Sequence, residues 1–293
     1  MSSVDSFHAC NHVGGLVSVA VRIEFPGAVH LVSNTADMLK DGLAETFVAA
    51  LQKTSALLRW DVYAWCVLPD RYRLIVRTAG ADLETGMRQL ASACTRHLPQ
   101  SGGHRVPAFS HPYCDTLLDP EGWLLPACRS VLTEPANAGL VAAAGDWAWS
   151  SYRETMSGKG PLAAWFSPDD HAMPAAFDTF LRAGSPETDP VCLSSPQEVL
   201  GSPAFRQSVA EHLVERASEP GVAAALIALT RPSLAEIFGS DARRERTQLR
   251  PRIEAAVRLG YSRAEIARQL GVHYTTVSRC LRPPDAPRRQ KSR

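Results

Sequence analysis

Two β-rich runs, residues 62–68 and 72–76, constrain the fold of this chain most, because only Pro69, Asp70 and Arg71 lie between them. Branched and aromatic residues favour extended strands. Proline followed by aspartate is typical of a tight turn. The pattern therefore predicts an antiparallel hairpin.

Other strand and helix patterns flank this hairpin. Residues 29–32 are expected to form a strand and residues 43–59 a helix, because apolar residues recur at helical intervals in the second range. After the hairpin, apolar residues every three or four positions from 83 to 98 predict another helix, and residues 114–118 predict a last strand. This order predicts an α+β fold, a ferredoxin-like sandwich with an antiparallel sheet and helices on one face.

A chain of 293 residues exceeds a typical single domain, so two folded units are expected. We expect a flexible leader at residues 1–18 and an α+β domain at 19–157. A linker and helical connector should follow at 158–230, with the main linker in the Pro- and Gly-punctuated residues 184–203. An all-α helix-turn-helix domain with a basic tail should occupy residues 231–293.

Residues 262–281 read SRAEIARQLGVHYTTVSRCL, which has the layout of two short helices around a tight turn. Ser262 and Glu265 have the spacing of a capping box. Gly271 is expected to end the first helix in a left-handed conformation, and Val272 to pack the turn. The inward apolar residues are expected to be Ile266, Ala267, Leu270, Val277 and Leu281.

This motif predicts a DNA-binding surface, because the start of the second helix enters the major groove in helix-turn-helix proteins. Arg279 suits guanine or phosphate, and the hydroxyl groups suit phosphate oxygens. The expected DNA contacts are His273, Tyr274, Thr275, Thr276, Ser278, Arg279, Arg263 and Arg282. The alternative is a helical hairpin whose polar face is merely solvated.

Charge is distributed unevenly along the chain. Residues 242–293 hold 14 lysines and arginines against 4 aspartates and glutamates, a net +10, although the formal charge of the whole chain is +1. The preceding residues therefore carry a net −9. A basic module attached to an acidic body suits binding to a polyanion, and a solvated basic tail is the alternative.

Several classes of protein do not fit the composition. No apolar run approaches the roughly 20 residues that a membrane helix needs, which predicts a cytoplasmic protein without a membrane partner. The seven cysteines are scattered and predict reduced thiols. Histidines such as His30 and His97 show no metal-ligand spacing and are expected at the surface or in loops.

Several stretches carry a family resemblance: RIEFPGAVHLVS from Arg22, VYAWCVLPDRYRLIV from Val62, GMRQL from Gly86, and AGLV followed by WAWSSYR up to Arg153. In their order and spacing they resemble the REP-associated tyrosine transposases, a branch of the single-tyrosine HUH transposase family. The resemblance covers residues 22–153 and implies a role in DNA transposition. It also implies a Mg or Mn cofactor held by two histidines, and a tyrosine nucleophile.

The chain departs from this family at each catalytic position. Arg71 and Arg73 stand where the family has the two metal-binding histidines, and guanidinium groups offer only hydrogen-bond donors. Cys94 stands at the place of the nucleophilic tyrosine, in an apolar stripe where an inert thiol is expected rather than a replacement nucleophile. We therefore expect no catalytic residues, no bound metal and no other cofactor.

Strand alternation places Arg71, Arg73 and Arg77 on one face of the hairpin, opposite Tyr72 and its neighbours. These arginines are further candidate DNA contacts, and pairing with the domain's excess acids is the alternative.

The sequence predicts a catalytically inactive DNA-binding protein related to transposases. Its expected partners are duplex DNA through the helix-turn-helix and hairpin or single-stranded DNA through the N-terminal domain, and a homodimer is left open. Two alternatives remain. One is an active single-strand transposase that uses a metal and an unidentified nucleophile, and the other is a ligand-responsive transcriptional regulator on a ferredoxin-like scaffold.

Overall fold

The chain divides into two units, Met1–Arg206 and Gln207–Arg293. The computed structural model describes residues 21–99, 106–109, 111–166, 173–183, 199–232, 234–239 and 246–281. The leader expected at residues 1–18, most of the expected linker and the basic tail from residue 282 lie outside these ranges.

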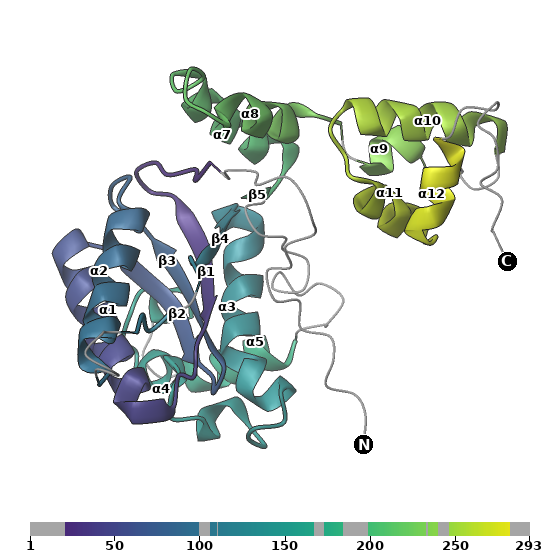
Figure 1. The fold of residues 1–293 in the computed structure, drawn as a ribbon. Coiled ribbons are helices and arrows are strands. Elements are labelled where there is room, and N and C mark those ends of the chain that lie inside the picture. The colour runs from purple at the N-terminus through teal and green to yellow at the C-terminus, as the bar shows by residue number, and fades with distance from the viewer. Residues whose placement is uncertain are drawn as a thin grey trace, which may run out of the picture. The chain divides into compact units, whose positions relative to one another are not determined.

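A five-stranded sheet forms the centre of the first unit (Figure 1). Its strands are β1 (Val29–Thr35), β2 (Asp61–Val67), β3 (Arg71–Arg77), β4 (Cys114–Leu118) and β5 (Val199–Leu200). They lie in the order β2-β3-β1-β4-β5. The pairs β2–β3, β3–β1 and β1–β4 are antiparallel, which confirms the predicted hairpin. The pair β4–β5 is parallel and makes the sheet mixed. The expectation of a purely antiparallel sheet is therefore wrong at this edge.

One face of the sheet is covered by α1 (Leu43–Leu58) and α2 (Leu83–His97). Tyr72, Leu74 and Val76 of β3 project into this core, as the strand alternation predicts. Gly86 of α2 allows close packing, because a Cβ there would lie 2.1 Å from the Trp60 ring. The short 3-10 helix η1 (Lys40–Gly42) leads into α1.

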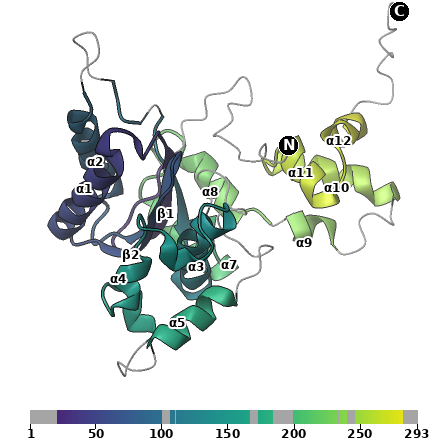
Figure 2. The same ribbon diagram turned by 90° about the horizontal axis from the view of Figure 1, so that it is seen from below.

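The other face is covered by α3 (Pro120–Asn137), which corrects the expectation of helices on one face (Figure 2). The physical reason is that the strands are apolar on both sides. Leu31 and Ile75 face away from α1 and α2 and are buried against Ala127 and Val131 of α3. A sheet with two apolar faces needs two covering layers.

The segment after α3 completes this second layer. It contains η2 (Ala144–Asp146), α4 (Tyr152–Met156), η3 (Ala163–Trp165) and α5 (Met173–Arg182). Trp149 and Ser151 pair with the backbone of the β2 edge, and Trp147 Nε1 donates to Val67 O over 2.8 Å. The aromatic stretch at residues 147–153 therefore packs against the sheet.

Part of the expected connector belongs to the first unit. Phe177 of α5 is fully buried in the core beneath α3. The described end of the expected linker forms β5, where the Asp119 N–H donates to Leu200 O at 2.7 Å. Ser202 donates to the Asp119 carboxylate through its N–H and its hydroxyl at 3.1 and 3.0 Å. These bonds hold β5 beside β4.

The second unit is helical. It begins within α7 (Pro203–Val214) and continues through α8 (Val222–Thr230), α9 (Leu234–Phe238), α10 (Arg246–Arg258), α11 (Arg263–Leu270) and α12 (Tyr274–Cys280). A core formed by α9 to α12 buries Phe238, Ile253, Ile266 and Val277. No described helix is long and apolar enough to cross a membrane.

Candidate nucleic-acid interface

Local sequence fixes both ends of α11. The Glu265 N–H donates to Ser262 Oγ over 3.2 Å, and the Ser262 N–H donates to the Glu265 carboxylate over 2.6 Å. This is the predicted capping box. At the other end Gly271 has φ 55° and ψ 43°, and the Val272 N–H donates to Ala267 O at 2.9 Å. A left-handed glycine therefore ends the helix, as expected.

The turn between the helices differs from the expectation in one respect. Val272 is 37% exposed, so it does not pack the turn. The turn is held instead by the backbone bonds around Gly271 and by Val277, which is fully buried. A buried residue in the middle of α12 fixes which face of that helix remains outside.

The outer face of α12 carries the predicted contact residues. His273, Tyr274, Thr276 and Arg279 are exposed, and Tyr274 has 55% of its surface open to solvent. Thr275 and Ser278 are half-buried. A hollow of about 290 Å³ is lined by Tyr274, Thr275, Ser278 and Arg279. The fold therefore gathers these hydroxyl and guanidinium groups on one surface.

His273 has a structural role that the sequence did not reveal. It is the N-cap of α12, and its Nδ1 lies 2.9 Å from Thr275 Oγ1 and accepts from the Thr275 N–H at 3.4 Å. Its ring packs against that of Tyr274 with centroids 4.6 Å apart. Because Nδ1 is engaged in the cap, Nε2 is the ring atom available to an external partner.

Positive charge around α11 and α12 is only partly compensated. Arg250 pairs with Glu254 at 2.9 Å, and Arg231 lies 3.5 Å from Glu265. Four exposed arginines in the second unit have no carboxylate within 4 Å among the described residues. They are Arg258, Arg263, Arg268 and Arg279. Uncompensated guanidinium groups are the side chains that bind phosphates most readily. Arg282 lies outside the described residues.

The three arginines of β3 have carboxylate partners. Arg71 Nε lies 3.1 Å and Arg73 Nε 2.7 Å from the Glu134 carboxylate on α3, and about an eighth of each of these three side chains is exposed. Arg77 pairs with Asp61, its Nε donating over 2.9 Å. The face that bears Arg71 and Arg73 is therefore covered by α3 instead of being an open basic surface. The sequence does not identify Glu134 as the partner of these arginines, because nothing local indicates which acid lies next to β3.

Cys94 lies on the opposite side of the sheet from Arg71 and Arg73. It is fully buried in α2 beside Met87 and Leu90, as the sequence predicts. Burial raises the pKa of its thiol to about 12. The sheet therefore separates Cys94 from Arg71 and Arg73, and the structure does not assemble them into one site.

Arg71 and Arg73 do not suit a divalent ion, because both side chains are positively charged and their nitrogen atoms are all hydrogen-bond donors. Elsewhere in the described ranges, no three His, Cys, Asp or Glu side chains are grouped so that they could share a metal ion.

His30 corrects the expectation that the histidines lie at the surface. It sits in β1 with no exposed surface, and its Nδ1 is 3.5 Å from Asp115 Oδ2. Neither ring nitrogen has a hydrogen bond of normal geometry among the described groups. The first four residues of β1, Val29–Val32, are buried on both faces of the sheet, because β1 lies between β3 and β4. The sequence alone did not show that β1 is central.

No family model matches the chain, and no curated protein matches it. Among solved structures, a REP-associated tyrosine transposase bound to a REP hairpin matches with a TM-score of 0.41 and 16% sequence identity. The match covers 53% of this chain and 93% of that one.

Proposed function

We propose that this chain is a transposase-like DNA-binding protein whose second unit binds duplex DNA through α11 and α12 as a helix-turn-helix. The observation that carries the proposal is the outer face of α12. Tyr274, Thr276 and Arg279 are exposed there, while Val277 of the same helix is locked into the core. A short helix fixed in this way presents one constant set of side chains, which sequence readout in the major groove requires.

Charge supports the same conclusion. Arg263 and Arg268 of α11 are exposed without a described carboxylate partner, as is Arg279. Each such group that meets a phosphate releases condensed counterions and strengthens binding to DNA. A helical hairpin that only faces solvent would not require unpaired arginines on both of its helices.

For the first unit we propose a ferredoxin-like fold that takes up hairpin or single-stranded DNA. The strand order β2-β3-β1-β4, with α1 and α2 as the connecting helices, supports this type of fold. The sequence resemblance over residues 22–153 is what suggests DNA as its ligand.

We further propose that the protein does not cut DNA. Arg71 and Arg73 are engaged by Glu134, and the Cys94 thiol is buried with a raised pKa. A guanidinium cannot polarise a phosphate as a Lewis acid does, and a protonated buried thiol is a poor nucleophile. Incubation with hairpin single-stranded DNA and Mg²⁺ or Mn²⁺ should leave no covalent protein–DNA adduct. Such an adduct would show an active transposase instead.

The test of the duplex-binding proposal begins with selection of bound fragments from genomic DNA, followed by affinity measurements on the selected site. Arg279→Ala is expected to weaken binding by roughly tenfold or more, the effect of losing one base or phosphate contact by arginine. Arg250→Gln is the matched control, because it removes the same charge from a guanidinium that Glu254 already compensates.

Two outcomes would contradict the proposal. Equal affinity of the Arg279→Ala and unaltered chains would exclude α12 as the contact helix. Equal losses in the Arg279→Ala and Arg250→Gln chains would indicate a general charge effect. A selected site made of two inverted half-sites would additionally indicate a dimer on DNA.

A further inference from the structure

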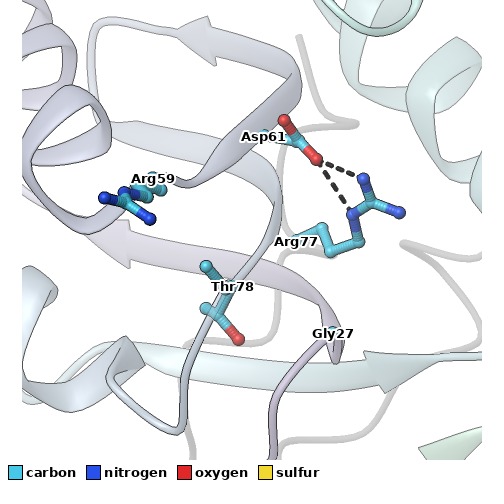
Figure 3. A pocket seen from close by; sticks show the side chains of 6 residues that line it. Gly27, Arg59, Asp61, Arg77 and Thr78 are labelled. Carbon is cyan, nitrogen blue, oxygen red and sulfur yellow. Dashed lines mark hydrogen bonds and ion pairs between the residues drawn. The ribbon is translucent and has the colours of Figure 1, made fainter.

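A second cationic hollow lies in the first unit, at the end of β3 away from Arg71 and Arg73 (Figure 3). It has a volume of about 280 Å³. The residues that line it come from the turn before β1, the end of α1, the start of β2 and the end of β3. They are Gly27, Arg59, Asp61, Arg77, Thr78 and Ala79.

Arg59, which lines this hollow, has an unusual backbone conformation. It follows the last turn of α1 with φ 55° and ψ 42°, a left-handed conformation in which its N–H donates to Ser55 O. Glycine is the usual residue at such a helix end, because a Cβ strains the backbone there. Among described residues other than glycine, only Asp41 also has positive φ, and aspartate tolerates this region better. An arginine in this conformation therefore points to a role for its side chain.

The guanidinium of Arg59 is exposed and has no carboxylate within 4 Å among the described residues. Across the hollow, Arg77 is held by Asp61, to which both Nε and Nη2 donate (Figure 3). This hydrogen bond raises the pKa of Arg77 and fixes the plane of its guanidinium. Two guanidinium groups against one carboxylate leave the hollow with net positive charge.

The remaining walls suit a small anion. No aromatic side chain lines the hollow, so no base would stack there. Gly27 has φ 83°, and a Cβ at that position would meet nothing within 4 Å, so the wall is open at this point. The Thr78 hydroxyl is buried and has no hydrogen-bond partner among the described groups. Guanidinium groups match the geometry of phosphate oxygens in particular.

We propose that Arg59 and Arg77 bind a backbone phosphate of the DNA strand that the first unit takes up. This inference rests on the proposed function, since the phosphate belongs to the hairpin or single-stranded ligand. Asp61 is a positioning residue, because it orients Arg77 and does not itself suit an anion. The contact point therefore lies at the end of β3 opposite Arg71 and Arg73.

The experiment uses the full chain carrying Arg263→Gln and Arg279→Gln, in which the proposed duplex interface is weakened. Affinity for hairpin DNA with single-stranded flanks is measured by fluorescence anisotropy at several salt concentrations. Adding Arg59→Gly removes the guanidinium and gives the backbone the residue that prefers its conformation, so the fold is retained. We expect roughly tenfold weaker binding, the scale of one charged hydrogen-bonded contact. We also expect the slope of log K against log salt to fall by about 0.7, as for one lost phosphate contact on a single strand.

Lys53→Gln in the same background is the matched control, because it removes an exposed positive charge from α1 outside the hollow. Unchanged affinity and slope in the Arg59→Gly chain would overturn the inference, and so would an equal loss in the Lys53→Gln chain. A background chain that binds no hairpin DNA would also overturn it while leaving the duplex proposal intact. Conversely, undiminished duplex binding by the background chain would refute the role of α12. Comparing the background chain with and without Arg59→Gly would still show whether the hollow binds a phosphate.

Discussion

Replacing Glu134 by glutamine tests whether its carboxylate ties α3 to β3. The Glu134 oxygens lie 3.1 Å from Arg71 Nε and 2.7 Å from Arg73 Nε, and the three side chains are only 12–13% exposed. Glutamine has nearly the same shape, so the substitution chiefly removes the negative charge. It leaves two guanidinium groups close together and largely out of water.

The size of the effect follows from this burial. Breaking a buried ion pair by removing one partner costs about 3–5 kcal/mol, whereas an exposed pair contributes at most about 1 kcal/mol. Residual exposure and the remaining amide oxygen favour the lower end of the first range, so we expect a loss of about 3 kcal/mol. With a urea m-value of about 2–3 kcal/mol per M, the midpoint should fall by about 1–1.5 M.

Tryptophan fluorescence measures this change specifically, because all six tryptophans lie in the first unit. Glu121→Gln is the control, since Glu121 is exposed on the same helix and its side chain makes no described ion pair. Equal midpoints for the Glu134→Gln and Glu121→Gln chains would refute the reasoning. Replacing Arg71, Arg73 and Glu134 together by apolar residues of similar size should restore much of the stability.

Three further predictions concern single positions. Gly271→Ala should destabilise the second unit by about 1 kcal/mol because φ is positive there, and faster amide exchange in α11 and α12 would show it; unchanged exchange would contradict the conformation of the turn. Ser262→Ala should cost about 1 kcal/mol through loss of the N-cap, measured in the same way, while an exposed serine such as Ser92 should tolerate alanine. Cys94 should resist iodoacetamide at pH 8 in the folded chain, because its pKa is raised to about 12 and almost no thiolate exists at pH 8. The half-exposed Cys280 should be alkylated before Cys94. Rapid alkylation of Cys94, detected by mass spectrometry, would contradict its burial.

Patterns read within a few residues predicted most of the local structure. The hairpin around Pro69, the capping box of Ser262 and Glu265 and the helix end at Gly271 all form as expected. Each depends on hydrogen bonds between neighbours in the chain, so residue type and spacing are sufficient to predict them. Burial of Cys94 was predictable for a similar reason, since an apolar stripe on a helix must face a core.

Tertiary structure decided what the arginines of the first unit do. Arg71 and Arg73 bind Glu134, which lies about sixty residues away on a helix that covers an unexpected face of the sheet. Arg59 and Arg77 line one hollow, to which the end of α1 and the end of β3 both contribute. The sequence determines which charges exist and which local turns form. Which charges compensate one another depends on long-range packing, because an ion pair requires proximity in space and is indifferent to separation along the chain.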